Sequence, residues 1–210
     1  MFRSVGIGAS FVFLVLACSG VALVASRYLF EGPGLSDFVM ANANAAPWLV
    51  VHVAGGVTAL VLGPWQFLTR LRNRAPRVHR WIGRAYVATC AVGGTGGLVL
   101  AFGTVQGPIA RWGFLLLALV WLTTTLTGWR RAVSGDYAKH GEWMIRSFSL
   151  TFAAVTLRVY LPLGPALGYD FDVAYRAIAW LCWVPNLVLA ELVVRWRRQL
   201  LIFQPLLSSR

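Results

Sequence analysis

Long apolar stretches separated by short polar segments dominate the chain. A helix needs about 17 to 25 mostly apolar residues to cross the hydrocarbon core of a bilayer. Six stretches reach that length, at residues 5–26, 47–68, 83–103, 112–129, 145–163 and 173–194. The polar segments hold the helix breakers Gly32-Pro33-Gly34, Gly107-Pro108 and Gly164-Pro165, and none is long enough for a further domain. The pattern predicts an all-α polytopic membrane protein, in which residues 1–210 form one six-helix bundle.

Composition agrees with this pattern and narrows the class of partner. Hydrophobic side chains make up 58% of the chain and charged ones 12%, with a mean hydropathy of +0.67. Soluble domains have about 45–50% apolar and about 25% charged residues. The net charge of +12 alone would suit a nucleic acid, but 10 Trp and 12 Phe in so apolar a chain need lipid or a very large core. We therefore expect no nucleic-acid partner, and disorder and coiled coil are excluded on the same figures.

Basic residues concentrate in alternate polar segments, which predicts an orientation. Only Arg27, Arg111 and Arg176 belong to the segments of one side, and Arg158 lies within a stretch. The other fifteen belong to the opposite side: Arg3, Arg70, Arg72, Arg74, Arg77, Arg80, Arg84, Arg130, Arg131, Lys139, Arg146, Arg195, Arg197, Arg198 and Arg210. Because cytoplasmic loops carry an excess of Lys and Arg, we expect both termini inside (N-in/C-in), in a bacterial inner membrane. Anionic lipids are the expected partners of this basic side, above all at residues 195–198.

Two histidines at the basic side are candidates for cofactor binding. His79 and His140 each stand among arginines just before an apolar stretch, so we expect neutral imidazoles. One interpretation is an interfacial residue that bonds a loop carbonyl or a lipid phosphate. The other is a pair of axial ligands for a b-type haem, with Arg80 and Arg146 at its propionates. The chain has three histidines, so it could hold at most one such haem.

A second pair of polar residues lies inside the apolar stretches, near the other side. His52 follows Pro47 by five residues, and Arg158 precedes Pro162 by four, so both are expected about 6–8 Å inside the membrane. A charge at that depth costs on the order of a few kcal/mol unless it is paired, hydrated or extended to the interface. Arg158 either extends outward to the headgroups or shares with His52 a cavity for an anion, a carbonyl or a quinone headgroup.

The other notable residues favour structural roles. His52, Gly56, Ala59, Gly63 and Gln66 follow one another at steps of three or four, and Gly83, Cys90, Gly94 and Gly97 form a similar face with one step of seven. Such faces of small residues predict close helix packing. Asn186 is expected to serve a backbone carbonyl freed near Pro185, and Glu191 to pair with Arg195. The three cysteines are expected to be buried. Nucleotide-binding, serine-hydrolase and zinc-protease motifs are missing, which argues against a hydrolase or a nucleotide-driven protein. Whether the protein is an enzyme of another class stays open.

Several motifs in order resemble a known family. They are His52, Gly63-Pro64-Trp65-Gln66-Phe67, His79-Arg80-Trp81-Ile82-Gly83-Arg84-Ala85-Tyr86, Trp143-Met144-Ile145-Arg146-Ser147, Leu157-Arg158, Trp183-Val184-Pro185-Asn186-Leu187 and Glu191. Over about residues 47–195 the chain is similar to the bacterial membrane proteins catalogued as domain of unknown function 2306. The resemblance implies a membrane topology and no established activity. The family is similar in gross plan to b-type cytochromes and ferric reductases, which carry two histidine pairs, whereas three histidines here do not allow two pairs.

Three functional hypotheses follow from these residues. The first is a redox or binding module for haem or quinone, built on the pair His79 and His140 with His52 and Arg158 at the other side. The second is a non-catalytic accessory subunit that docks through its small-residue faces to a larger membrane complex. The third is a transporter of a small anion, which depends on Arg158 alone.

Overall fold

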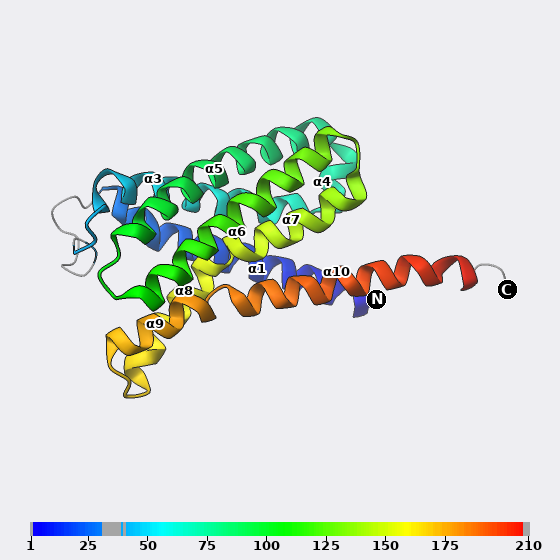
Figure 1. The fold of residues 1–210 in the computed structure, drawn as a ribbon. Helices are drawn as coiled ribbons and strands as arrows, with labels where there is room; N and C mark the ends of the chain where they lie inside the picture. The colour runs from blue at the N-terminus through cyan, green and yellow to red at the C-terminus, as the bar shows by residue number, and fades with distance from the viewer. Residues whose placement is uncertain (1, 31–38, 40, 208–210) are drawn as a thin grey trace.

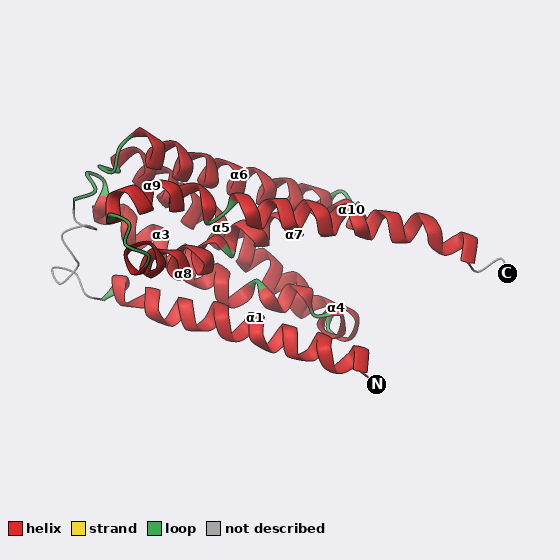
Figure 2. Ribbon diagram, turned by 90° about the horizontal axis from the view of Figure 1, so that it is seen from below, coloured by secondary structure: helices red, strands yellow, loops and turns green. Residues whose placement is uncertain are grey.

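The computed structural model describes residues 2–30, 39 and 41–207, of which 2–7 and 200–207 by backbone alone. The regular elements of this part are helices, drawn in Figures 1 and 2. They are α1 (Phe2–Ser26), η1 (Arg27–Leu29), α3 (Ala45–Leu62), η3 (Pro64–Phe67), α4 (Thr69–Arg74), α5 (Pro76–Gly103), α6 (Pro108–Val133), α7 (Tyr137–Thr151), α8 (Ala153–Ala166), α9 (Phe171–Leu181) and α10 (Val184–Leu207). The predicted Gly32-Pro33-Gly34 break and Arg210 lie outside the described residues.

The six predicted spans are confirmed, but the helices reach beyond the apolar stretches. Six segments are long and apolar enough to cross a membrane: Gly8–Leu29, Ala45–Phe67, Pro76–Gly103, Pro108–Val133, Tyr137–Ala166 and Phe171–Gln199. Residues 69–82, the basic segment between the second and third apolar stretches, form α4 and the first two turns of α5 and not a loop. Hydropathy locates only the part of a helix that lies in hydrocarbon, whereas Arg and Lys side chains let the helix continue into the interface.

The bundle has two distinct ends (Figures 1 and 2). α3, α5, α6 and α7 lie side by side, α1 runs along α3 and α8, and α10 leans on α7. The start of α1, the short α4 and the end of α10 lie at one end, which we call the basic end. α9 and the loop between α5 and α6 lie at the other, which we call the opposite end. The basic segments of the sequence are therefore gathered at one end of the bundle.

Glycines bring α3 and α5 into backbone contact. A Cβ atom on Gly55 would lie 2.4 Å from the Gly93 nitrogen, and one on Gly96 would lie 2.8 Å from the His52 nitrogen. A Cβ on Gly56 would meet nothing within 4 Å. The prediction of small-residue packing is confirmed, although the closest approach is at Gly55 and not at Gly56. Gly94 packs instead on α6, where its Cβ would lie 2.6 Å from Leu122.

Spans five and six are each interrupted near their middle. α7 and α8 meet at Phe152, and α9 and α10 are separated at residues 182–183. The amide Nδ2 of Asn186 lies within hydrogen-bond distance of Cys182 O (3.0 Å), Ser149 O (3.3 Å) and the Thr156 hydroxyl (3.2 Å). The predicted structural role of Asn186 is thus confirmed, and it links both interrupted helices.

The predicted break at Gly164-Pro165 is wrong, whereas the one at Gly107-Pro108 is confirmed. α8 runs through Pro162 and Pro165 to Ala166, because the fixed φ of proline is itself helical near a helix end. The turn comes only at Gly168, with φ +83°. Gly107 has φ +90°, and Pro108 follows as the first residue of α6, where its missing N–H costs nothing.

Candidate functional site

His79 and His140 lie in the first turns of two helices, both at the basic end. α5 begins at Pro76 and α7 at Tyr137, so both histidines lie in helices and not in the predicted loops. The imidazoles are close enough for their charges to interact. His140 Nδ1 lies 2.9 Å from the carbonyl oxygen of Gly128. Because a carbonyl only accepts, Nδ1 carries the hydrogen, and Nε2 is the ring nitrogen left for another partner.

Gln66 and His79 each bury a polar atom that has no partner. Both Gln66 Nε2 and His79 Nδ1 are inaccessible to solvent and lack a hydrogen bond to any described residue. Gln66, on η3, lies over Gly83, where a Cβ would be 3.1 Å from Gln66 Oε1. His79 precedes Gly83 by four residues and so shares its helix face. We call Gln66, His79, Gly83 and His140 the basic-end site.

Unpartnered buried groups are rare because they are costly. A buried donor or acceptor without a hydrogen bond costs about 1–3 kcal/mol. Folded proteins therefore leave few of them, and each one calls for an explanation such as a ligand. The sequence predicts Gln66 on a packing face and His79 at a cofactor. It does not predict that Gln66 lies over the α5 face of His79, because the η3 turn that carries Gln66 has no signal of its own.

The two arginines expected at haem propionates make other contacts. Arg80 lines a surface cavity of about 390 Å³ together with Arg77, Trp81 and Arg84. Arg146 donates to the carboxylate of Glu191, at 2.5 Å from Nε and 3.0 Å from Nη2, and its guanidinium lies 4.7 Å from the Trp143 ring. The arginine whose charge acts on His79 is Arg72, on α4.

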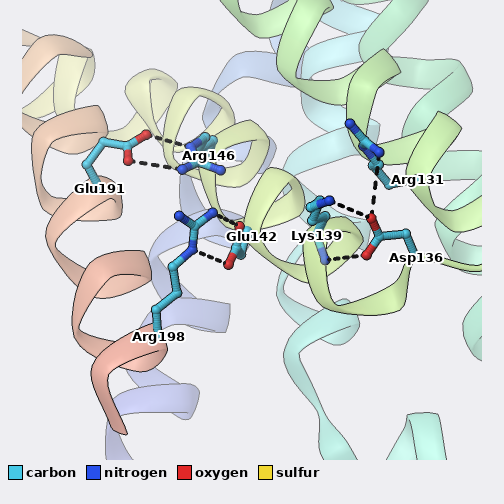
Figure 3. A network of polar contacts seen from close by, with 7 residues as sticks. All are labelled: Arg131, Asp136, Lys139, Glu142, Arg146, Glu191 and Arg198. Carbon is cyan, nitrogen blue, oxygen red and sulfur yellow. Dashed lines mark hydrogen bonds and ion pairs between the residues drawn. The ribbon is translucent and has the colours of Figure 1, made fainter. Parts of the chain in front are cut away.

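Ion pairs at the basic end tie the helices together (Figure 3). Glu191 of α10 pairs with Arg146 of α7, so the predicted pairing with Arg195 is wrong. A facing helix offers Glu191 a bidentate guanidinium, which is stronger than an i,i+4 contact along one exposed helix. Arg198 and Glu142 join α10 and α7 a second time.

Asp136 caps α7 at the same end. Its carboxylate accepts from the Lys139 amide at 3.2 Å and pairs with the side chains of Lys139 and Arg131. The Lys139 amide, followed by the Lys139 and Arg131 charges, lowers the pKa of the Asp136 carboxyl. A carboxylate at a helix N-terminus is also favoured by the helix dipole.

A buried hydroxyl cluster occupies the middle of the bundle. The Tyr86 hydroxyl lies 2.8 Å from Thr151 Oγ1 and 3.1 Å from Ser147 Oγ. Trp121 Nε1 donates to Thr151 Oγ1 at 2.9 Å, and Thr125 Oγ1 lies 2.6 Å from Ser147 Oγ. Each of the five side chains thus has a partner, and the cluster joins α5, α6 and α7. A hydropathy pattern does not reveal this cluster, because Tyr86 and Trp121 count as apolar in it.

His52 and Arg158 lie in the halves of their spans that face the opposite end. His52 Nδ1 is 2.8 Å from the carbonyl oxygen of Gly93. The Arg158 charge acts on His52, and the charges of Tyr28 and Arg27 act on Arg158. Arg158 Nη1 donates to Ala154 O at 3.0 Å, one turn back toward the middle of the bundle. This bond gives Nη1 a partner within α8, and both alternatives for Arg158, the outward extension and the cavity shared with His52, stay predictions.

The described residues contain no cluster of side chains that could bind a metal ion. No group of three or more His, Cys, Asp or Glu side chains comes close enough there to hold a metal ion. Cys18, Cys90 and Cys182 are buried, as expected.

Comparison with known proteins agrees with the fold. Searches of curated proteins and of solved structures return no match. One family model matches, over residues 49–194, and its description is that of a predicted membrane protein, DUF2306. The match covers most of the chain and includes both histidine regions, and the six spans described above fit its description. The chain therefore belongs to the DUF2306 family of predicted membrane proteins, whose function is unknown.

Proposed function

We propose that the protein binds a ring with hydrogen-bonding carbonyl groups, of the quinone class, at the basic-end site. The observation that carries this proposal is the pair of buried unpartnered atoms, Gln66 Nε2 and His79 Nδ1. An amide N–H can only donate, and a quinone carbonyl can only accept, so the two match. The lipid-soluble ring and tail of a quinone suit a site at the edge of a membrane-embedded bundle, and its redox chemistry makes the protein a redox module.

A b-type haem is the second candidate, favoured by the proximity of the two histidines. The bond from His140 Nδ1 to Gly128 O is the kind of contact that orients a metal-ligating imidazole. His79 and His140 would hold the haem iron, and the haem would supply one-electron chemistry. The haem propionates would need arginine partners. Arg146 is already paired with Glu191, and the arginine whose charge acts on His79 is Arg72.

Binding of decylubiquinone to the purified protein tests the first candidate. We expect Gln66→Leu and His79→Leu to weaken binding, measured by quenching of tryptophan fluorescence, about tenfold or more, since a hydrogen bond to a buried group is worth about 1–3 kcal/mol. Gln199→Leu is the matched control, because Gln199 is exposed on α10. Equal binding by wild type and Gln66→Leu would refute the quinone site.

An absorption spectrum tests the haem candidate on the same samples. After expression with ample haem supply, a haem-binding protein shows a Soret band that His79→Ala and His140→Ala each abolish. His52→Ala should leave the band unchanged, because His52 lies at the opposite end. A colourless wild-type protein would exclude the haem.

We also propose that the basic end faces the cytoplasm of a bacterial cell, with the protein in the inner membrane. Support comes from the gathering of α4, the start of α5 and the end of α10 at one end, which concentrates the positive charge there. Ser134→Cys and Tyr169→Cys, both at exposed positions, place one thiol at each end. A membrane-impermeant maleimide should label Tyr169→Cys in intact cells and Ser134→Cys only after permeabilisation. The reverse pattern would invert the orientation.

A further inference from the structure

The start of α5 carries three exposed arginines on one side of the helix. Arg77, Arg80 and Arg84 follow one another at steps of three and four, so their side chains project in the same direction. His79 and Tyr86, which are half-buried and buried, belong to the opposite side of α5. The arginine side therefore faces away from the bundle, toward the surroundings of the protein.

The three arginines enclose a surface hollow together with Trp81. The hollow has a volume of about 390 Å³ and is lined by Arg77, Arg80, Trp81 and Arg84. The Arg84 guanidinium lies 5.1 Å from the centre of the Trp81 ring, and this cation–π contact favours the position of one wall of the hollow. The lining is thus three positive charges and one exposed indole.

The positive charge of this hollow is not compensated within the part of the chain that the structure describes. None of the ion pairs seen there includes Arg77, Arg80 or Arg84, and none of the three donates a side-chain hydrogen bond to a described residue. Like charges one turn apart on a helix destabilise it. An anion in the hollow removes that repulsion and accepts from the guanidinium N–H groups.

The hollow lies at the level of the lipid headgroups at the basic end. The apolar stretch of this span begins at residue 83, so Arg77, Arg80 and Trp81 precede it and Arg84 stands at its start. The indole of Trp81 is 68% exposed, and tryptophan is enriched at the membrane interface because its ring is apolar and its N–H is polar. The anions that an outward-facing hollow meets at this level are the phosphates of the surrounding lipids.

We propose that the hollow on α5 binds the headgroup of a phospholipid that carries two phosphate groups. Arg77 and Arg84 are seven residues apart, about 10 Å along the helix axis, and Arg80 lies between them. Each guanidinium presents parallel N–H groups that match the oxygens of a phosphate. Three such donors over this length suit two linked phosphodiesters. The basic-end site uses the opposite side of α5, through His79, so the two sites are independent.

Native mass spectrometry of the purified protein in detergent tests the hollow with two lipids. Tetraoleoyl cardiolipin has two phosphates and dioleoyl phosphatidylglycerol has one, and we expect the first to bind about tenfold more tightly at equal phosphate concentration. Arg80→Gln, in the middle of the hollow, should weaken cardiolipin binding about tenfold. Arg80→Lys should weaken it about threefold, because the charge remains but the fork is lost.

Arg130→Gln is the matched control. Arg130 is an exposed arginine near the end of α6, at the same end of the bundle, and it does not line the hollow. The control removes the same charge, so it should change cardiolipin affinity by less than about twofold. General attraction of anionic lipids to the basic side needs no particular arginine, whereas binding in the hollow does.

Tighter binding of cardiolipin that Arg80→Gln weakens and Arg130→Gln keeps supports the site. Equal losses in the two variants overturn it, and so does a wild type that binds cardiolipin no more tightly than phosphatidylglycerol or binds neither lipid. If Arg80→Gln does not fold, Arg77→Gln carries the same test at the edge of the hollow, with an expected loss of about fivefold. Unchanged affinity in Arg77→Gln then overturns the site.

Discussion

The middle of the bundle and its basic end differ in whether their buried polar groups have hydrogen-bond partners. In the middle, Tyr86 and its neighbours on α6 and α7 satisfy one another with hydrogen bonds. At the basic end, Gln66 and His79 each bury an atom without a partner. His79, Gly83 and Tyr86 lie on one face of α5, so the same helix face serves both regions. The hydrogen bonds in the middle hold the helices together. The polar atoms without partners at the basic end could bond a ligand.

The largest expected loss of stability comes from a substitution at the close contact between α3 and α5. Gly55→Ala puts a methyl group 2.4 Å from a backbone atom of Gly93, so the helices must separate. We expect a loss of about 3 kcal/mol or more, measured by thermal unfolding in detergent. Gly56→Ala is the control, with open space around its Cβ, and should change stability by less than about 1 kcal/mol. Equal losses would show that the middle is not tightly packed.

Removing one hydroxyl from the middle should cost stability and spare ligand binding. Tyr86→Phe leaves Ser147 and Thr151 short of a partner in a buried position, and we expect a loss of about 1–2 kcal/mol. Tyr137→Phe, at an exposed position, should have no effect on unfolding. If Tyr86→Phe abolished decylubiquinone binding and left stability unchanged, the assignment of roles to the two regions would be reversed.

The corresponding change at the basic end should have the opposite sign for stability. Gln66→Leu removes a buried amide that has no partner for its nitrogen, so the variant should be as stable as the wild type or up to about 1 kcal/mol more stable. Thr151→Val, a polar-to-apolar change in the middle, should destabilise under the same conditions. Measuring both by thermal unfolding without quinone isolates the difference. A large loss in Gln66→Leu would mean that the amide has a structural partner.

The smallest effect is a pH dependence at the edge of the basic end. The pKa of the Asp136 carboxyl is lowered in the folded protein, chiefly by the Lys139 amide. Its contribution to stability is complete above the ordinary pKa of about 4 and disappears as the pH falls through the lowered value. Asp136→Asn keeps a capping side chain but has no titrating group, so its unfolding temperature should fall less than that of the wild type on acidification. Identical pH profiles would contradict the lowered pKa.

Much of the fold follows from the sequence because hydropathy acts locally. A run of apolar residues requires a spanning helix whatever its neighbours are, so the six spans and the Gly107-Pro108 break could be predicted. Helix ends at the basic side could not, because Arg side chains allow a helix to continue past the hydrocarbon. His79 and His140 were singled out by type, since few ionisable residues lie near apolar stretches.

Side-chain pairing across helices is where sequence reasoning stopped. Glu191 has Arg195 four residues away, yet it bonds Arg146, which is 45 positions distant and on a facing helix. Tyr86 and Trp121 look like ordinary apolar residues until Thr151 is placed between them. Nothing in the local sequence near Gln66 indicates that its amide lies over α5.

The sequence by itself determined the class of protein, the number of its spans and the segregation of positive charge, because each depends on transfer of single segments from water to lipid. Only the tertiary structure decided which polar groups meet. It placed Gln66 over Gly83, one turn from His79 on the same face of α5, and it paired Arg158 with the carbonyl of Ala154. These contacts depend on helix rotation and order around the bundle, which hydropathy does not specify, and they are what raises the question of a ligand.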